Sequence, residues 1–358
     1  MQNKQTLCVV FGGQSPEHDI SCRSVVSVLN HLNPEKYSIH TIGITKSGAW
    51  YLYTGPTDLI ADGTWATSKD YLKKAIISPD AEDKAILILE DDYVRKLFPD
   101  VVFPVLHGEH GEDGTMQGLL ELANLKYVGM GVLSSANCMD KTFTKIILDS
   151  VGIPQAKWVT VNAWETDRFD FYMDKIENEL GFPCFVKPAT TGSSVGVGKA
   201  HSRRELAVLL DNAAQFARKI LVEENIDGRE VECSILGNEN PLAGEVGEIL
   251  PTVEFYDFDA KYNSSSTKLE IPANISDDVR EEIRSLAIRA FRAMDGAGLS
   301  RVDFFIRNSD GKIILNEINT MPGFTSISMY PKLWDAAGLS YDALLDKLIE
   351  LALSSKKQ

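Results

Sequence analysis

The 358-residue sequence has few cysteines, no surplus of positive charge and no long hydrophobic segment. Its five cysteines are dispersed and form no C-x-x-C pair, so a disulfide framework or zinc site is disfavoured and a reducing compartment is favoured. The net charge of −15 argues against nucleic-acid and anionic-membrane partners. With no visible signal peptide or membrane span, we expect a cytoplasmic protein.

Length and composition indicate an ordinary globular chain. A chain of 358 residues, 44% of them hydrophobic, is long enough for two or three domains. The apolar run "TLCVVFGG" near the N-terminus is typical of a buried first strand that ends in glycines. Together with the later runs "YSIHTIGIT" and "VVFPVL", it predicts an α/β unit that ends near residue 130.

Apolar periodicity predicts the main helices. We expect a helix over 20–32 capped by Asp19, a helix from about residue 134 to the break near Gly152, and a long helix after Ser276. The third of these has the clearest apolar stripe. Residues 54–84 are polar and irregular, and their sequence does not assign them to any element.

A glycine- and serine-rich stretch, "FVKPATTGSSVGVGKA", spans residues 185–200 and suggests phosphate binding. It fits neither of two common nucleotide motifs. A P-loop would need glycine where Ser193 stands and Ser or Thr where Ala200 stands, and a dinucleotide fingerprint would need glycine at His201. Lys187, at the end of an apolar strand, can instead meet a phosphate together with backbone N–H groups of the loop.

A second chemical feature is a predicted hairpin late in the chain. The strands "SRVDFFIR" and "KIILNEIN" are joined by a turn containing Asp310-Gly311, a strong hairpin signal. Side chains two apart on a strand share a face, so Glu317 and Asn319 can converge with Asp303 of the adjoining strand. Three oxygen donors suit Mg²⁺. The alternative is a solvated strand face with ordinary acidic residues.

The segment "LVEENIDGRE" ends another predicted strand in acidic residues. Main-chain groups near Glu223 and Glu224 could contact an adenine edge, and Glu230 could accept hydrogen bonds from ribose hydroxyls. Surface charge is the alternative for Glu224. Taken together, the strand lysine, Gly/Ser loop, acidic strand end and late D…E-x-N pattern resemble the ATP-grasp fold, an α/β (α+β) architecture.

Six ordered motifs narrow the resemblance to the D-alanine–D-alanine ligase family over about residues 6–353: "GGQSPEHDIS", "FPVLHGEHGEDGTMQG", "FVKPATTGSSVGVGKA", "FYDFDAKY", "SRVDFF" and "LNEINTMPGFTSISMYPKLW". The resemblance implies an N-terminal α/β substrate domain at 1–130, a central ATP-grasp subdomain at 131–228, and a C-terminal ATP-grasp domain with metal site and closing loop at 229–358. It also implies a homodimer.

The implied reaction consumes ATP. ATP phosphorylates the carboxylate of one D-alanine, and the amine of a second D-alanine attacks the acyl phosphate. The resemblance implies two Mg²⁺ (or Mn²⁺) ions held by Asp303, Glu317 and Asn319, with Glu317 bridging. The implied nucleotide contacts are Lys141, Lys187 and Lys261 with the Ser194 loop at the phosphates, Glu223, Glu224, Ile226 and Phe255 at the adenine, and Glu230 at the ribose.

Further roles follow from the same motifs. Arg301 and the Gly323 N–H would stabilise the tetrahedral oxyanion. Glu17 would pair with the ammonium of the first D-alanine, close to His107, and Ser328 would contact the carboxylate of the second. Glu17, Ser193 and Tyr262 would form a hydrogen-bonded trio that locks the closed loops. Outside the pattern, Ser193 would be an ordinary loop hydroxyl, His107 a turn histidine and Ser328 a helix-start residue.

Two positions bear on the acceptor. Lys261-Tyr262 matches the dipeptide-forming branch rather than the D-alanine–D-lactate branch, and apolar Met329 suits a methyl group. An apolar pocket rejects an added hydroxyl only weakly, so a D-alanine–D-serine ligase is the alternative. Another ATP-grasp carboxylate–amine ligase, or an inactive nucleotide-binding regulator, is disfavoured by the N-terminal motifs and by the intact set of charged residues.

Overall fold

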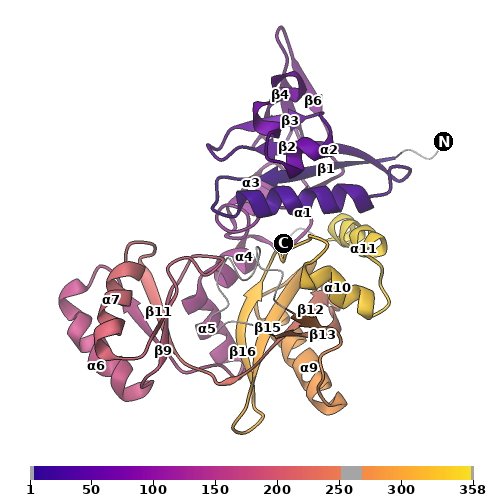
Figure 1. Ribbon diagram of the computed structural model, residues 1–358. Helices are drawn as coiled ribbons and strands as arrows, with labels where there is room; N and C mark the ends of the chain where they lie inside the picture. The colour runs from indigo at the N-terminus through magenta and orange to yellow at the C-terminus, as the bar shows by residue number, and fades with distance from the viewer. Residues whose placement is uncertain (1–3, 251–267, 356–358) are drawn as a thin grey trace.

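The structure, a computed structural model, describes residues 4–250 and 268–355 of the chain. Its strands form three sheets in a mixed α/β architecture, and the first sheet occupies the N-terminal part at the top of Figure 1. This sheet has the strand order β6-β5-β4-β3-β2-β1-β7, with β1 parallel to both β2 and β7. Its strands are β1 (Gln5–Gly12), β2 (Tyr37–Ile44), β3 (Trp50–Tyr53), β4 (Leu72–Ile77), β5 (Ile86–Leu89), β6 (Val94–Leu97) and β7 (Val101–Pro104).

Helix α1 (His18–His31) follows β1, and α3 (Thr115–Leu122) follows β7. The expected cap at Asp19 is wrong. The helix begins earlier, so Glu17 occupies the N-cap position and Asp19 lies in the first turn, where its charge still favours the helix N-terminus.

The segment 54–84, which the sequence left unassigned, contains short elements around a buried tryptophan. They are α2 (Thr57–Ala61), the 3₁₀ turns η1 (Trp65–Thr67) and η2 (Lys69–Tyr71), and β4. The Trp65 side chain is fully buried and packs edge-on against Phe11. One large aromatic anchor, rather than a periodic pattern, therefore fixes this segment, which explains why periodicity did not reveal it.

The single helix expected after residue 134 is also wrong, because the chain forms two helices, α4 (Val132–Met139) and α5 (Lys141–Ser150). Asp140 separates them. It has extended backbone, and its carboxylate accepts hydrogen bonds from the Thr142 and Phe143 N–H groups as the N-cap of α5. The apolar spacing continues through this break, so it concealed the new start.

The second sheet is antiparallel, in the order β10-β9-β11-β8. Its apolar face packs under two helices that sit at the left of Figure 1. The elements of this unit are β8 (Trp158–Asn162), η3 (Thr166–Arg168), α6 (Phe169–Glu179), β9 (Cys184–Pro188), β10 (Gly198–Ala200), α7 (Arg203–Ala213) and β11 (Lys219–Glu224).

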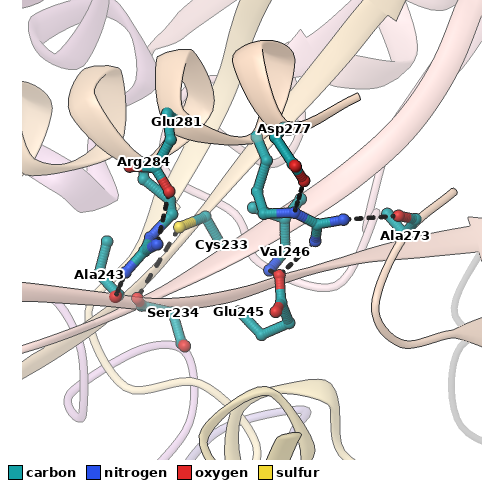
Figure 2. A network of polar contacts seen from close by, with 10 residues as sticks. Cys233, Ser234, Ala243, Glu245, Val246, Ala273, Asp277, Glu281 and Arg284 are labelled. Carbon is teal, nitrogen blue, oxygen red and sulfur yellow. Dashed lines mark hydrogen bonds and ion pairs between the residues drawn. The ribbon is translucent and has the colours of Figure 1, made fainter. Parts of the chain in front are cut away.

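The third sheet has the order β14-β13-β12-β15-β16, with all neighbours antiparallel. Helix α9 (Asp277–Ala293) covers it and begins after Ser276, whose hydroxyl accepts from the Val279 N–H as expected. Figure 2 shows Arg284 of α9 reaching the sheet, where it donates to the Ala243 carbonyl at 2.8 Å. The strands are β12 (Gly228–Leu236), β13 (Leu242–Leu250), β14 (Lys268–Glu270), β15 (Leu299–Arg307) and β16 (Ile313–Asn319).

The C-terminal helices α10 (Met329–Ala336) and α11 (Tyr341–Ser354) return to the N-terminal unit, and Figure 1 shows α11 beside α1. The Tyr37 hydroxyl donates to Asp346 Oδ1 at 2.8 Å, and one apolar core joins both ends of the chain. The cavity described below therefore lies among units that are packed together. None of the helices described is both long and apolar enough to cross a membrane.

Candidate active site

A cavity of about 600 Å³ lies where the second and third sheets meet the loops of the N-terminal unit. Residues of the second and third sheets, of α4 and α5, and of N-terminal loops line it. The residues singled out from the sequence that line it are Glu17, His107, Lys141, Lys187, Ser193, Ser194, Glu223, Glu224, Ile226, Glu230, Arg301, Glu317, Asn319 and Gly323. Phe255, Lys261 and Tyr262 lie outside the described residues.

The late hairpin forms as expected from β15 and β16, with Asp303 opposite Glu317 and Arg301 opposite Asn319. The Asp303 carboxylate is buried just behind the cavity wall. It accepts two hydrogen bonds from Arg301, at 2.8 and 2.7 Å, and one from Asn319 Nδ2 at 2.9 Å. Asp303 and Asn319 thus belong to one hydrogen-bonded network, and Glu317 is the strand partner of Asp303.

That donor set has the composition expected for a hard cation that a phosphate ligand would help to hold. Among the described residues, no cluster of three or more His, Cys, Asp or Glu side chains is placed to bind a metal. Asp303, Glu317 and Asn319 provide two carboxylates and one carboxamide. Mg²⁺ commonly uses one or two carboxylates together with phosphate oxygens and water, so these residues fit the ion in combination with a nucleotide.

Glu232, on β12, is a buried member of this network that the sequence analysis missed. It lies opposite Asp303 in the β12–β15 pairing, and its Oε2 is 2.9 Å from Arg301 Nε. Burial alone would lower the pKa of Arg301, but the charges of Asp303 and Glu232 raise it well above its ordinary value. The guanidinium is therefore fixed between two carboxylates. An acidic residue within the apolar strand "REVECSILG" was the available signal.

Three lysines face the cavity near the Gly/Ser loop. Lys187 Nζ lies 2.6 Å from Glu223 Oε2, and Lys145 pairs with the other oxygen of the same carboxylate. Burial would raise the pKa of Glu223, but the two lysines together lower it to about 2. Lys141 Nζ donates to the Thr191 carbonyl at 2.6 Å, and burial lowers its pKa. No sequence motif indicated a role for Lys145.

The Gly/Ser loop closes against the N-terminal unit through Glu17. The Ser193 hydroxyl donates to Glu17 Oε1, and Ser193 adopts a left-handed backbone with φ of 46°. Two glycines make room for the carboxylate. An added Cβ would lie 2.1 Å from Glu17 Oε2 at Gly108 and 2.8 Å from it at Gly192. A side chain at Gly108 would therefore displace the Glu17 carboxylate from this position.

His107 is buried beside this carboxylate, and burial lowers its pKa. As the neutral ring it donates from Nδ1 to the Met321 carbonyl at 3.1 Å and accepts at Nε2 from the Ser24 hydroxyl at 3.0 Å. Glu112, a second residue that the sequence analysis missed, accepts from the Gly108 N–H at 2.7 Å. Burial, reinforced by the charge of Glu17, raises the pKa of Glu112 to about 8.

Ser328 and Met329 do not line the cavity. Ser328 Oγ accepts from the Thr325 N–H at 3.0 Å, and it lies so close to Gly323 that an added Cβ there would be 2.7 Å away. Met329 is buried against Ile249 and Leu333. The structure thus places Ser328 next to a cavity residue and Met329 in a small apolar core, and their substrate roles remain predictions.

At the far end of the cavity, β11 leads into the turn before β12. Glu224 Oε1 accepts from the Lys157 N–H at 2.8 Å, so its side chain fastens β11 to the start of β8 rather than extending freely. Ile226 and Glu230 line the same end. The residues predicted to contact adenine and ribose thus lie close in sequence to Glu223, with which Lys145 and Lys187 pair, whereas Lys141 contacts the Gly/Ser loop.

Comparison with known protein families accounts for most of the chain. The family model described as "D-ala D-ala ligase N-terminus" matches residues 6–130, and that described as "D-ala D-ala ligase C-terminus" matches residues 147–350. A protein named D-alanine–D-alanine ligase from Thermoanaerobacter sp. (strain X514) is 50% identical over 99% of this chain and 98% of its own length. One of the same name from Acetivibrio thermocellus is 48% identical over 99% and 97%.

Solved structures similar to this one are also ligases of this kind. The VanG D-Ala:D-Ser ligase from Enterococcus faecalis is 39% identical, with a TM-score of 0.89 over 98% of this chain and 100% of that one. The D-alanine–D-alanine ligase from Coxiella burnetii is 36% identical, with a TM-score of 0.85 over 98% and 94%. These ligases have the ATP-grasp fold, which confirms the fold expected from the sequence. The chain therefore belongs to the D-alanine–D-alanine ligase family, whose members form a peptide bond.

Proposed function

We propose that the chain joins two D-alanine molecules to D-alanyl-D-alanine, consuming ATP through a D-alanyl phosphate and so supplying peptidoglycan synthesis. The observation that carries the proposal is one cavity in which Arg301, Lys187 and Glu17 meet from three different units. A carboxylate is a poor acyl donor because its leaving group would be oxide. Phosphorylation supplies a leaving group, and the site must then position reactants and neutralise charge.

Each group of cavity residues has a proposed role that follows from its position. Lys141 and Lys187 contact the phosphates, the turn around Ile226 binds the adenine, and Glu230 binds the ribose. Glu17 binds the ammonium of the first D-alanine with His107 nearby. Arg301, fixed by buried carboxylates, and the Gly323 N–H then stabilise the oxyanion of the tetrahedral intermediate. A pre-positioned cation costs little reorganisation during the reaction, which is why its fixation matters.

Two Mg²⁺ or Mn²⁺ ions are the proposed metals, held by Asp303, Glu317 and Asn319 with nucleotide phosphates. When bound, they would neutralise phosphate charge during transfer. The chain's own contribution is to keep the three oxygen donors on paired strands. Because Asp303 is already hydrogen-bonded to Arg301 and Asn319, it is held in place before any ion arrives.

The acceptor is proposed to be D-alanine, with D-serine as the alternative. The alternative is supported by the 39% identity to a D-Ala:D-Ser ligase over 98% of this chain. The two acceptors differ by one hydroxyl, which an apolar pocket discriminates only weakly. D-lactate is less favoured, since Lys261-Tyr262 matches the dipeptide-forming branch.

We further propose a homodimer in the cytoplasm. Leu122, Val132 and Leu133 are exposed large apolar side chains on the neighbouring helices α3 and α4, so they offer an apolar face for a second copy. The five cysteines are buried thiols without disulfides, as suits a reducing compartment. Sedimentation of the wild type and of Leu133→Asp tests the dimer, since the aspartate should shift the chain to monomer.

Incubation of the purified chain with ATP, Mg²⁺ and equal amounts of D-alanine, D-serine and D-lactate tests the activity and its acceptor. Mass spectrometry should find D-alanyl-D-alanine as the main product, with ADP and phosphate formed in step with it. D-alanyl-D-serine as the main product would favour the alternative. A depsipeptide as the main product, or ATP consumption independent of D-alanine, would refute the proposed acceptor or the proposed reaction respectively.

A further inference from the structure

Helix α5 presents two lysines to the cavity, one turn apart. Lys141 and Lys145 are four residues apart, so their side chains lie on the same face of the helix, and both line the cavity. Lys145 is 2% exposed, which is unusual for a lysine and requires a paired charge. Lys145 matches none of the sequence motifs that point to nucleotide or substrate binding.

The partner of Lys145 is shared with a proposed phosphate ligand. Glu223, 4% exposed, pairs through Oε1 with Lys145 and through Oε2 with Lys187, the latter at 2.6 Å. A Lys187–Glu223 pair by itself has no net charge, so it would attract a polyphosphate weakly. With Lys145 included, the three side chains have a net charge of about +1.

The net charge of these three side chains matters because the rest of the cavity is acidic. More carboxylates than cationic side chains line the cavity, and the chain as a whole carries a charge of −15. A buried region of low polarisability screens such charges weakly, so one unit of charge among these side chains changes the electrostatic potential at a bound phosphate considerably. A triphosphate therefore needs a local excess of positive charge.

We propose that Lys145 is a positioning and charge-balancing residue for nucleotide binding: it neutralises and anchors Glu223, so that Lys187 keeps a net positive charge for the phosphates. This inference rests on the proposed use of ATP. It assigns Lys145 no contact with the reacting atoms. Its effect is exerted through Glu223 and Lys187, and it acts on the phosphates of the nucleotide rather than on the base.

The test separates phosphate recognition from base recognition by comparing ADP with adenosine. Equilibrium dissociation constants are measured without divalent metal for the wild type, Lys145→Met and Glu223→Gln. The measured quantity is the factor by which ADP binds more tightly than adenosine. Lys145→Met removes one positive charge and should reduce this factor on the order of tenfold, whereas Glu223→Gln removes one negative charge and should increase it.

The decisive result is that the two variants change the factor in opposite directions. A merely structural role for Lys145 and Glu223 does not predict opposite changes. If both variants distorted the pocket, they would weaken adenosine and ADP alike and leave the factor unchanged. The matched control is Lys73→Met, which breaks the Lys73–Glu90 pair of the first sheet, where neither residue lines the cavity, and should leave the factor unchanged. Thermal unfolding of each variant confirms that it folds.

An unchanged factor in Lys145→Met, or a factor lowered in both variants, overturns the inference. If Lys145→Met does not fold, Glu223→Gln is a sufficient test by itself. An unchanged or smaller factor in Glu223→Gln also overturns the inference. Failure of the wild type to bind ADP more tightly than adenosine would instead overturn the proposed nucleotide site. The two failures are therefore distinguishable.

Discussion

Ser193 of the Gly/Ser loop donates its hydroxyl hydrogen to Glu17 at the start of α1, joining residues 176 positions apart in the chain. The contact links the loop over the proposed phosphate site to the unit proposed to bind the first D-alanine. Gly108 and Gly192 leave room for the same carboxylate. Closure of the loop and placement of Glu17 are thus one structural event.

The first prediction concerns this link. Ser193→Ala removes a hydrogen bond to a charged acceptor, a contribution of about 1.5–3 kcal/mol, so kcat should fall by roughly tenfold or more. With an ATP analogue bound, protease should also cleave residues 190–197 faster in Ser193→Ala than in the wild type. The control is Ser202→Ala, which removes the N-cap of α7 outside the cavity. Equal loop cleavage in Ser193→Ala and wild type would refute the link.

The second prediction concerns Glu232. Glu232→Gln removes the charge of one of the two carboxylates that flank Arg301, so we expect kcat to fall by about tenfold with a smaller change in the KM for ATP, because Arg301 is proposed to act on the intermediate. Steady-state kinetics measure both constants. Glu245→Gln is the matched control, since Glu245 pairs with Arg280 of α9 on the same sheet but outside the cavity. A similar loss of kcat in both variants would mean that the effect is one of sheet stability.

The third prediction concerns pH. The Glu112 carboxyl of the folded chain has a pKa near 8, raised by burial, whereas an exposed glutamate titrates near 4.5. The folded state therefore holds one more proton than the unfolded state between these pH values, so this group lowers stability as pH rises from about 4.5 to 8.

Glu112→Gln removes the titrating carboxyl and with it this decrease of stability with pH. The stability of the variant relative to wild type should rise across this range, by on the order of a few kcal/mol. Chemical unfolding at pH 5.5, 7 and 8.5 measures it, with Glu109→Gln, an exposed substitution in the same loop, as the control. A stability difference that is constant with pH would show that the Glu112 carboxyl is ionised throughout.

The fourth prediction concerns the proposed metal donors. Asn319→Ala removes one oxygen donor and the hydrogen bond to Asp303, so the Mg²⁺ concentration for half-maximal activity should rise by about tenfold or more. Binding of Mn²⁺ in the presence of ADP, followed by electron paramagnetic resonance, should weaken in parallel. Asn308→Ala, in the exposed turn of the same hairpin, should change neither. Unaltered Mn²⁺ binding in Asn319→Ala would remove this residue from the metal site.

Sequence patterns predicted the late hairpin because Asp310-Gly311 fixes the turn, and strand alternation then places Asp303 opposite Glu317. They also predicted the ATP-grasp fold through motif resemblance. They did not identify Glu232, although an acidic residue in an apolar strand was a signal, and they could not predict the pairing of Lys145, whose partner Glu223 is distant in sequence. Lys145, for example, is an ordinary helical lysine until β11 brings Glu223 to it.

Local sequence patterns did not predict the elements whose bounds depend on capping or tertiary packing. Apolar spacing runs unbroken from α4 into α5, and only the capping bonds of Asp140 divide them. The segment around Trp65 has no period because one buried aromatic side chain anchors it. The return of α11 to α1, through contacts such as that of Tyr37 with Asp346, has no signal in any local pattern.

The central claim is that ATP activates the carboxylate of the first D-alanine, and transfer of oxygen isotope tests it most directly. D-alanine labelled with ¹⁸O in its carboxylate is incubated with the chain, ATP and Mg²⁺, and the released phosphate is analysed by mass spectrometry. Attack of the carboxylate on the γ-phosphate predicts one ¹⁸O atom in each phosphate for each dipeptide formed. Dipeptide formed together with unlabelled phosphate would contradict the account.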